Sequence, residues 1–264
     1  MTRKRLILIL VVVCICAGGF VVIRPLLPYS FHDKALEAAA REELGMQEGE
    51  SVSLQDLAKV KKLNLFYQAP IDLSELKYMP NIEELNILGA TINDFSPVSN
   101  LKSLQSISIM NASISSLEGI DKAANLKSFS VFSTPISDIS PLRKCNQLED
   151  VALVGTMVMD LSPLQSAKDL TQLSVQESML SDISPISEMK KLEVLSLTMN
   201  MIGDIEPIRG LTNLKKLFLA YNEITDISPL ERLTNLEKLD VSSNPIKDAG
   251  VLDTLHTYGT EITR

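Results

Sequence analysis

Apolar residues recur along most of the chain with a fixed period. The segments LTNLEKLDVSSNPIKD and LTNLKKLFLAYNEITD lie 22 residues apart, and the same step places nine units over residues 60–257 without insertion or deletion. Positions 1, 4, 6, 11, 14, 17 and 20 of each unit are apolar, with Pro70 as the single exception. Self-similarity at such a period is the sequence signature of stacked repeat architectures.

Two spacings within the unit predict its local structure. Positions 4 and 6 alternate, so their side chains point to one face of a short strand. Positions 11, 14, 17 and 20 step by three, which is the spacing of 3₁₀ turns. Each unit is therefore predicted to be a strand, a turn and a loosely helical return. One such coil cannot bury its apolar side alone, so we expect the coils to stack around a continuous core.

Polar residues mark the turns of the unit. Asp occupies position 13 in eight units, and Ser followed by Pro occupies positions 15 and 16 in five of them. We expect the Asp carboxylates to accept local backbone N–H groups rather than to bind calcium. The Ser-Pro pair is interpreted as an N-cap followed by the first helical residue. Asn200, Asn222 and Asn244 at position 9 are expected to bond the backbone of the turn that leaves the strand.

The segments that flank the repeats are predicted to cap the stack, because a terminal coil would otherwise expose its core. Residues 31–59 are interpreted as an N-terminal helical cap, with Asp33 beginning a helix, Gly45 ending it and Ser53 beginning a second turn. Residues 258–264 are interpreted as a C-terminal cap that adds a short polar edge strand.

The repeat pattern resembles the 22-residue class of leucine-rich repeats, which includes the internalin-like proteins of bacterial surfaces and phosphatase-regulatory repeat proteins. Residues 192–236 carry it most clearly, with LEVLSLTMNMIGDIEPIRGLTN followed by LKKLFLAYNEITDISPLERLTNL. The resemblance implies an α/β fold: a right-handed leucine-rich-repeat solenoid with a parallel sheet on its concave face. It also implies protein binding through that face, although fold alone does not establish function.

The outward side of the predicted sheet holds the candidate binding residues. Position 7 is apolar over five successive units, which predicts a stripe roughly 20 Å long at a strand spacing of ~4.8 Å. Exposed apolar patches often mark contact sites, whereas a side chain tucked under the turn would be structural. A second cluster is predicted near the C-terminal end of the sheet. The candidates for partner binding are Phe66, Tyr67, Leu88, Met110, Phe132, Val154, Met199, Phe218 and Tyr221.

The N-terminal segment is typical of a membrane signal. Residues 6–23 contain no charge and no proline, and three basic residues, Arg3, Lys4 and Arg5, precede them. Eighteen apolar residues span roughly 27 Å as a helix, close to the hydrocarbon thickness of a bilayer. Residues 1–30 are therefore interpreted as a signal anchor and linker, with the repeats outside the cytoplasm. The alternative is a signal peptide cleaved near Ala17 and Gly18.

Composition narrows the classes of function. The chain of 264 residues has a net charge of -8, which argues against a nucleic-acid partner. It has two His, three Cys and no Trp, and Cys145 falls at an apolar position of its unit. No Ser-His-Asp, Cys-His, phosphate-binding or metal-ligand pattern appears, so we expect no catalytic residues, no metal, no cofactor and no small-molecule substrate.

The sequence therefore predicts a non-catalytic module that binds a protein ligand through its sheet and is held at the cell membrane by residues 6–23. One alternative is a secreted repeat protein. Another is an intracellular regulatory scaffold of the phosphatase-binding repeat class, against which the N-terminal segment argues.

Overall fold

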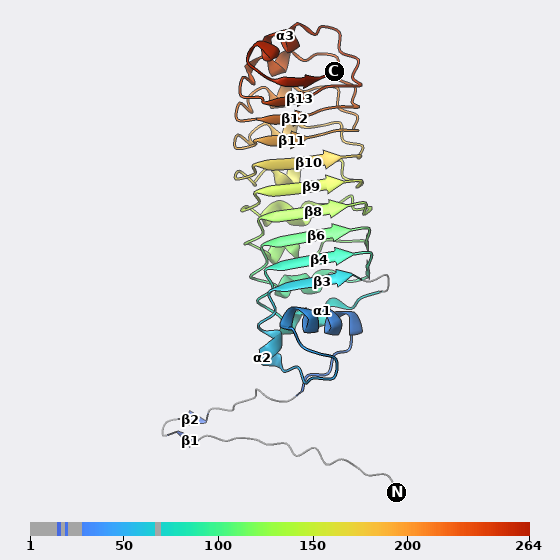
Figure 1. The fold of residues 1–264 in the computed structure, drawn as a ribbon, viewed down its shortest axis with the longest axis vertical. Helices are drawn as coiled ribbons and strands as arrows, with labels where there is room; N and C mark the ends of the chain where they lie inside the picture. Colours follow the sequence, from blue (N-terminus) through green and yellow to red (C-terminus); the bar gives the residue numbers. More distant parts are fainter. Residues whose placement is uncertain (1–14, 17–18, 21–27, 67–69) are drawn as a thin grey trace.

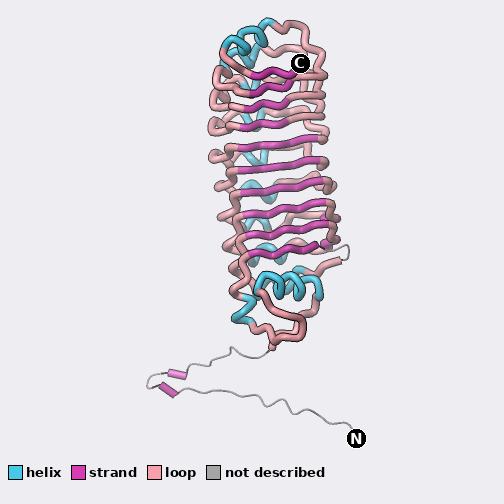
Figure 2. The backbone as a smooth tube through the Cα atoms, in the orientation of Figure 1, coloured by secondary structure: helices cyan, strands magenta, loops and turns pink. Residues whose placement is uncertain are grey.

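The protein is an elongated stack of short coils (Figure 1). The computed structural model describes residues 15–16, 19–20, 28–66 and 70–264. Helices α1 and α2 lie at one end of the stack and helix α3 lies at the other, with the strands of one sheet between them (Figure 1). The short helical turns lie behind the strands (Figure 2), so one side of the stack is the sheet and the opposite side carries the returns.

The main sheet has ten parallel strands, and their order across the sheet follows their order along the chain. Its first nine strands start at intervals of 22 residues, and equivalent positions are paired: Leu63 with Leu85, and Leu85 with Ile107. The sheet confirms the predicted solenoid. Its strands are β3 (Lys62–Phe66), β4 (Glu84–Leu88), β6 (Ser106–Met110), β8 (Ser128–Phe132), β9 (Asp150–Val154), β10 (Gln172–Gln176), β11 (Val194–Ser196), β12 (Lys216–Phe218), β13 (Lys238–Asp240) and β14 (Glu261–Thr263).

The returns are 3₁₀ turns, as the three-residue spacing predicts. They are η1 (Leu73–Tyr78), η2 (Ser96–Asn100), η3 (Ile120–Lys122), η4 (Ser140–Lys144), η5 (Ser162–Leu164), η6 (Ser184–Ile186), η7 (Glu206–Ile208) and η8 (Ser228–Arg232). The last return is instead an α-helix, α3 (Gly250–Thr257). Two further short strands, β5 (Thr91–Ile92) and β7 (Ser113–Ile114), form a separate parallel pair.

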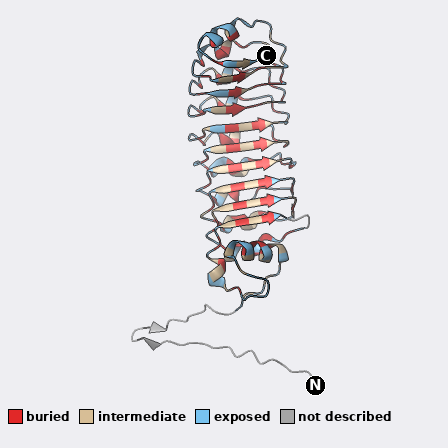
Figure 3. Cartoon of the chain, viewed as in Figure 1, coloured by how far each residue is buried: buried red, intermediate tan, exposed pale blue. Residues whose placement is uncertain are grey.

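The core is a continuous column inside the coils. Strands β3, β4 and β6 each bury their second and fourth residues and leave the fifth exposed, an alternation visible as red and lighter bands in Figure 3. Pro70, the one exception to the apolar pattern, is exposed, and the neighbouring Ile71 is buried in its place.

The N-terminal end is held by two capped helices. In α1 (Lys34–Leu44), the Asp33 carboxylate accepts the N–H groups of Ala35 and Leu36 at 2.8 and 3.0 Å, and Gly45 ends the helix with a φ of 64°. Ser53 and Asp56 form a reciprocal capping box on α2 (Leu54–Leu57). These contacts confirm the predicted starts of both helices.

The Ser-Pro interpretation was wrong by one position. Ser96 is the first residue of η2 rather than its N-cap, and Phe95 at the N-cap makes no side-chain cap bond. The capping oxygen comes from Asp94, whose Oδ1 accepts the Ser96 N–H at 2.9 Å. Asp138 and Asp182 accept the corresponding Ser N–H groups at 2.8 Å, so the local role predicted for the Asp row is confirmed.

The Asn row also acts as predicted. Asn200 donates to the Val175 and Leu197 carbonyls at 2.8 and 3.0 Å and accepts the Leu180 N–H at 3.1 Å. It therefore joins its own coil to the preceding one. The predicted C-terminal edge strand is present as β14, which pairs in parallel with β13.

Most of the predicted membrane segment, residues 6–23, lies outside the described residues. The described parts of it are β1 (Ile15–Cys16) and β2 (Gly19–Phe20), which pair antiparallel and so differ there from the predicted helix. Among the residues that the structure describes, none of the helices combines the length and the apolar character needed to cross a membrane.

Candidate binding surface

The five apolar residues of position 7 form one row across the sheet. Strand register places Phe66 beside Leu88, Leu88 beside Met110, Met110 beside Phe132 and Phe132 beside Val154. We call these residues the apolar stripe. Because all five end their strands on the outward side, their side chains lie outside the buried core cluster.

The stripe is most open at its N-terminal end. The exposed fraction is 56% for Phe66, 39% for Leu88 and 38% for Met110, and Phe132 and Val154 are half-buried. Tyr67, predicted to extend the stripe, lies outside the described residues. Beyond Val154 the row continues with Gln176, which donates to the Ser174 hydroxyl at 2.7 Å, so the apolar surface stops there.

Two polar rows run beside the stripe, and at their N-terminal end the side chains pair with each other. In the middle row, Asn86 donates to the Asn64 side-chain oxygen at 2.9 Å. In the next row, Lys62 lies 2.8 Å from Glu84. The partial exception is Asp150, whose pKa is raised by burial. The N-terminal part of the sheet face therefore combines apolar groups in contact with water and polar groups that have partners within the chain.

The second predicted cluster lies on neighbouring coils. Met199 and Tyr221 occupy equivalent positions in successive units and are 50% and 59% exposed. Both have a left-handed backbone, with φ of 59° and 57°. Phe218 is half-buried on β12. The structure places these three residues on adjacent coils without bringing them into the apolar stripe.

Sequence reasoning missed a group of exposed methionines. Met157, Met159, Met179 and Met201 are all between 44% and 57% exposed, and they lie in the turns that follow β9, β10 and β11. The sequence pattern predicted turns at these positions but did not predict which of their side chains face the solvent. The available signal was methionine at position 10 in three consecutive units.

Titratable groups do not gather into a reactive site in the described part of the chain. There, no three His, Cys, Asp or Glu side chains are grouped as metal ligands would be. Burial, and secondarily Asp121, raises the pKa of Cys145 to about 11, so its thiol remains protonated. Hydrogen bonds from Ser96 hold the pKa of Asp94 below its usual value, which again reflects turn structure.

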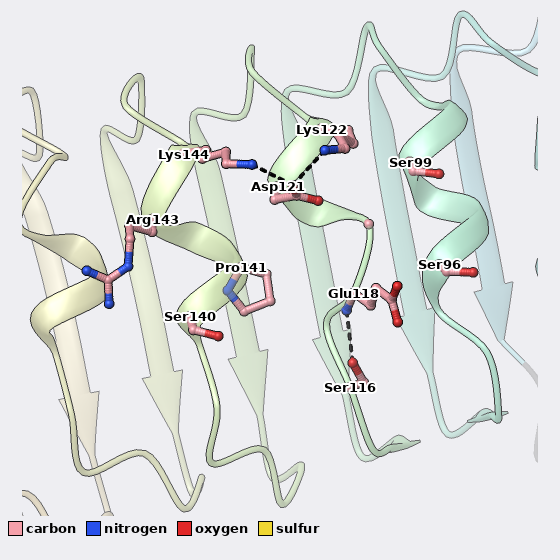
Figure 4. Close-up of a pocket in the computed structure, with 11 residues that line it drawn as sticks. Ser96, Ser99, Ser116, Glu118, Asp121, Lys122, Ser140, Pro141, Arg143 and Lys144 are labelled. Carbon is pink, nitrogen blue, oxygen red and sulfur yellow. Dashed lines mark hydrogen bonds and ion pairs between the residues drawn. The ribbon is translucent and has the colours of Figure 1, made fainter.

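A groove of about 570 Å³ opens on the side of the returns, away from the sheet (Figure 4). It lies where the third unit carries Ser116, Glu118 and Gly119 in place of the Asp, Ser and Pro of other units. Asp121 lies at its edge and pairs with Lys122 and Lys144 at 2.9 and 3.1 Å. The groove is thus the structural result of one irregular repeat.

Comparison with known proteins agrees with this geometry. A family model described as leucine rich repeats (2 copies) matches residues 212–254. No curated protein sequence matches the chain. The repeat pattern, the parallel sheet and the family match together show that the chain has the leucine-rich-repeat fold.

Its solenoid is similar to those of the Listeria internalins. Internalin C2 of Listeria monocytogenes matches with a TM-score of 0.66 and 24% identity over 88% of this chain and 94% of that one. Internalin F of the same species matches with a TM-score of 0.60 and 21% identity over 90% and 97%. The plant peptide hormone receptor RGFR1 in complex with RGF2 matches with a TM-score of 0.62 and 18% identity. That match covers 72% of this chain and 33% of the receptor chain.

Proposed function

We propose that this protein is a non-catalytic binding module that engages a protein ligand through its sheet face, with the apolar stripe as the main contact. The aligned row of apolar side chains from Phe66 to Val154, exposed over its first three members and half-buried over the last two, is the observation that carries the proposal. Burying such a row against a partner removes apolar surface from water. Neighbouring polar side chains such as Glu84 and Asn86, which have partners within the chain, serve as a rim that excludes water.

The ligand that fits this surface has an apolar edge. The stripe crosses five strands, roughly 20 Å at the usual strand spacing, which is the length of a short extended segment or of one helix face. The similarity to a receptor solved in complex with a peptide hormone supports a protein or peptide ligand. The negative net charge of -8 favours a ligand that is not strongly acidic.

We further propose that the repeats lie outside the cytoplasm. This location is supported by the basic residues Arg3, Lys4 and Arg5 ahead of the apolar segment 6–23. Protease added to intact cells is expected to digest the repeats. Digestion only after lysis would contradict the proposed location. N-terminal sequencing of the mature chain distinguishes a membrane anchor from a cleaved leader.

The binding proposal is tested with Phe132→Ser. Phe132 lies outside the core cluster, so the variant is expected to remain folded, and loss of an apolar contact of about 2 kcal/mol would weaken ligand binding ~30-fold. The measurement is retention of extracytoplasmic proteins on the immobilised full chain, followed by affinity for the retained ligand. Met110→Lys is expected to act similarly, because it would bury an unpaired charge.

Thr198→Ser is the matched control, since Thr198 holds the same repeat position beyond the stripe. It is expected to bind the ligand as tightly as the parent chain. Should Phe132→Ser unfold the protein while residual binding persists, the stripe would be part of the core and the proposal would fail.

A further inference from the structure

Five exposed methionines are concentrated on three consecutive coils. Met157, Met179 and Met201 lie 22 residues apart, each at position 10 of its unit, and we call them the methionine row. Their exposed fractions are 53%, 51% and 44%. The Met157 N–H donates to Ile136 and the Met201 N–H donates to Leu180, each at 2.9 Å, so these turns pack on the preceding coil in the same way.

Two further thioethers lie on the same outward side. Val158, between Met157 and Met159, is fully buried, and Asn200, between Met199 and Met201, is buried as well. The methionines on either side of each buried residue are themselves between 44% and 57% exposed, so both Met-X-Met segments direct their methionines outward. Met159 and Met199 therefore flank the methionine row.

Coil geometry does not require methionine at these positions. In the other described units, position 10 holds polar or turn-forming residues: Thr91, Ser113, Pro135, Glu223 and Pro245. Methionines that serve packing are found in the core instead, since Met79 and Met189 are fully buried. The exposed methionines consequently need an explanation other than folding.

The spacing of the row suits a soft metal ion. Thioether sulfur is a soft ligand that selects ions such as Cu(I). With metal–sulfur bonds of about 2.3 Å, two sulfurs on one ion lie within roughly 4.6 Å of each other. Adjacent coils of the sheet are ~4.8 Å apart, and the three rotatable bonds of methionine allow the outer side chains to lean towards the central one.

The local charge favours a cation. Residues 155–160, 177–182 and 199–204 contain Asp160, Glu177, Asp182 and Asp204 and no Lys or Arg. Three of these carboxylates accept N–H groups of the following turns at 2.7 to 2.8 Å. They supply negative potential while their oxygens are already engaged, which disfavours hard ions such as Mg²⁺ and Ca²⁺ as occupants.

We propose that the methionine row binds one soft monovalent cation, Cu(I) or its redox-stable analogue Ag(I), with Met179 as the central ligand and Met157 and Met201 on either side. None of these three residues belongs to the apolar stripe, and the site does not depend on the proposed protein-binding function.

The test uses the full-length protein with Cys14→Ser and Cys16→Ser, because free thiolates would compete for the ion. Ag(I), or Cu(I) under anaerobic conditions with a chromophoric competing chelator, is titrated into protein labelled at its methionine methyl groups. We expect the methyl signals of Met157, Met179 and Met201 to shift at one equivalent, and those of Met79 and Met189 to stay unchanged.

Met179→Leu keeps an apolar side chain of similar size but removes the sulfur, so affinity is expected to fall at least about tenfold while the circular dichroism is unchanged. Met110→Leu, at an exposed methionine of the apolar stripe, is the control and is expected to bind like the parent. Equal binding by Met179→Leu, or equal shifts at every exposed methionine, would overturn the proposal.

The pH dependence gives a second, independent criterion. A thioether does not titrate, so affinity is expected to be constant between about pH 5 and 8, where a histidine site would change. Affinity that rises steeply with pH would show that titrating groups hold the ion, and the assignment to the methionine row would be wrong.

Discussion

Tyr221 stands at the position after its strand where the backbone is left-handed in each described unit from β4 to β13. The equivalent residues include Gly89 and Gly155, with φ of 73° and 62°, and Tyr221 itself has φ of 57°. Outside glycine, this conformation costs roughly 1–2 kcal/mol. A large, 59% exposed aromatic residue held in this conformation contributes little to folding, which is consistent with a role at the surface.

The effect of a substitution at Tyr221 on stability is expected to depend on backbone conformation rather than on side-chain size. Tyr221→Gly should leave the free energy of unfolding within about 1 kcal/mol of the parent, because relief of strain offsets the extra freedom of the unfolded chain. Tyr221→Val should be clearly less stable, since a β-branched residue is poorly tolerated at positive φ. Denaturant midpoints measure the stability of both variants. A Tyr221→Gly variant less stable than Tyr221→Val would contradict this account.

Asp150 gives the sheet face a pH dependence. Burial raises its pKa above the ordinary value of 3.8, so the folded state holds the proton more tightly than the unfolded state. Ionisation of Asp150 therefore lowers stability as pH rises from about 3.8 through the raised pKa.

Asp150→Asn is accordingly expected to raise the melting temperature at pH 7. It should have little effect at a pH below the Asp150 pKa of both the folded and the unfolded state. Thermal melts at the two pH values measure the difference. Asp240→Asn, at the end of β13 in the same sheet, is the comparison variant. A larger gain for Asp150→Asn in acid than at pH 7 would show that the sign is wrong.

At the scale of elements, Glu75 joins the N-terminal cap to the first coil. It is 2% exposed, and its carboxylate accepts the Tyr29 hydroxyl and the N–H groups of His32 and Asp33, the latter two at 3.2 and 3.1 Å. Burial and the Glu75 carboxylate together raise the pKa of Tyr29. One side chain of η1 therefore positions the segment that leads into α1.

Removal of this carboxylate should loosen the cap. Glu75→Ala is expected to cost about 1–3 kcal/mol, because donors that lose their acceptor remain partly shielded from water. Tyr29→Phe removes a single donor and should cost about 1 kcal/mol. Chemical denaturation measures the loss of stability in each variant, and proteolysis around residues 29–33 measures the loosening of the cap. Identical denaturation midpoints for Glu75→Ala and the parent would disprove the role of Glu75 in holding the cap.

Elements whose apolar residues repeat were predictable, and those decided by exact hydrogen-bond geometry were not. The spacing of Leu63, Leu85 and Ile107 fixed the strand register because burial selects one face. The spacing did not reveal that Asp94, rather than Ser96, supplies the capping oxygen, since both residue types favour helix starts. The apolar stripe was predictable from periodicity, whereas Met179 lay in a turn to which no face had been assigned.

At the scale of the whole molecule, stability is distributed along the stack. Each coil contacts its neighbours, so an array of this kind behaves as a chain of nearest-neighbour interfaces. Leu195 is fully buried and is paired with Leu173 on one side and Leu217 on the other. A cavity at Leu195 therefore affects two interfaces directly.

Leu195→Ala is expected to cost ~2–5 kcal/mol, as for other buried leucines. Amide hydrogen exchange should accelerate most in β10, β11 and β12 and least in β3 and β4, which lie far along the stack. Leu63→Ala, in β3, should give the reverse distribution. Uniform acceleration in both variants would mean that the solenoid opens as one cooperative unit.

The constant 22-residue register also makes the length of this protein adjustable in whole steps. Excision of residues 104–125 would remove one complete coil and join equivalent positions of the coils on either side. The solenoid would keep its strand order, while the apolar stripe would lose Met110. Excision of residues 192–213 would shorten the stack equally and leave the stripe whole. Natural gain or loss of repeats by recombination could thus resize the recognition surface independently of the fold.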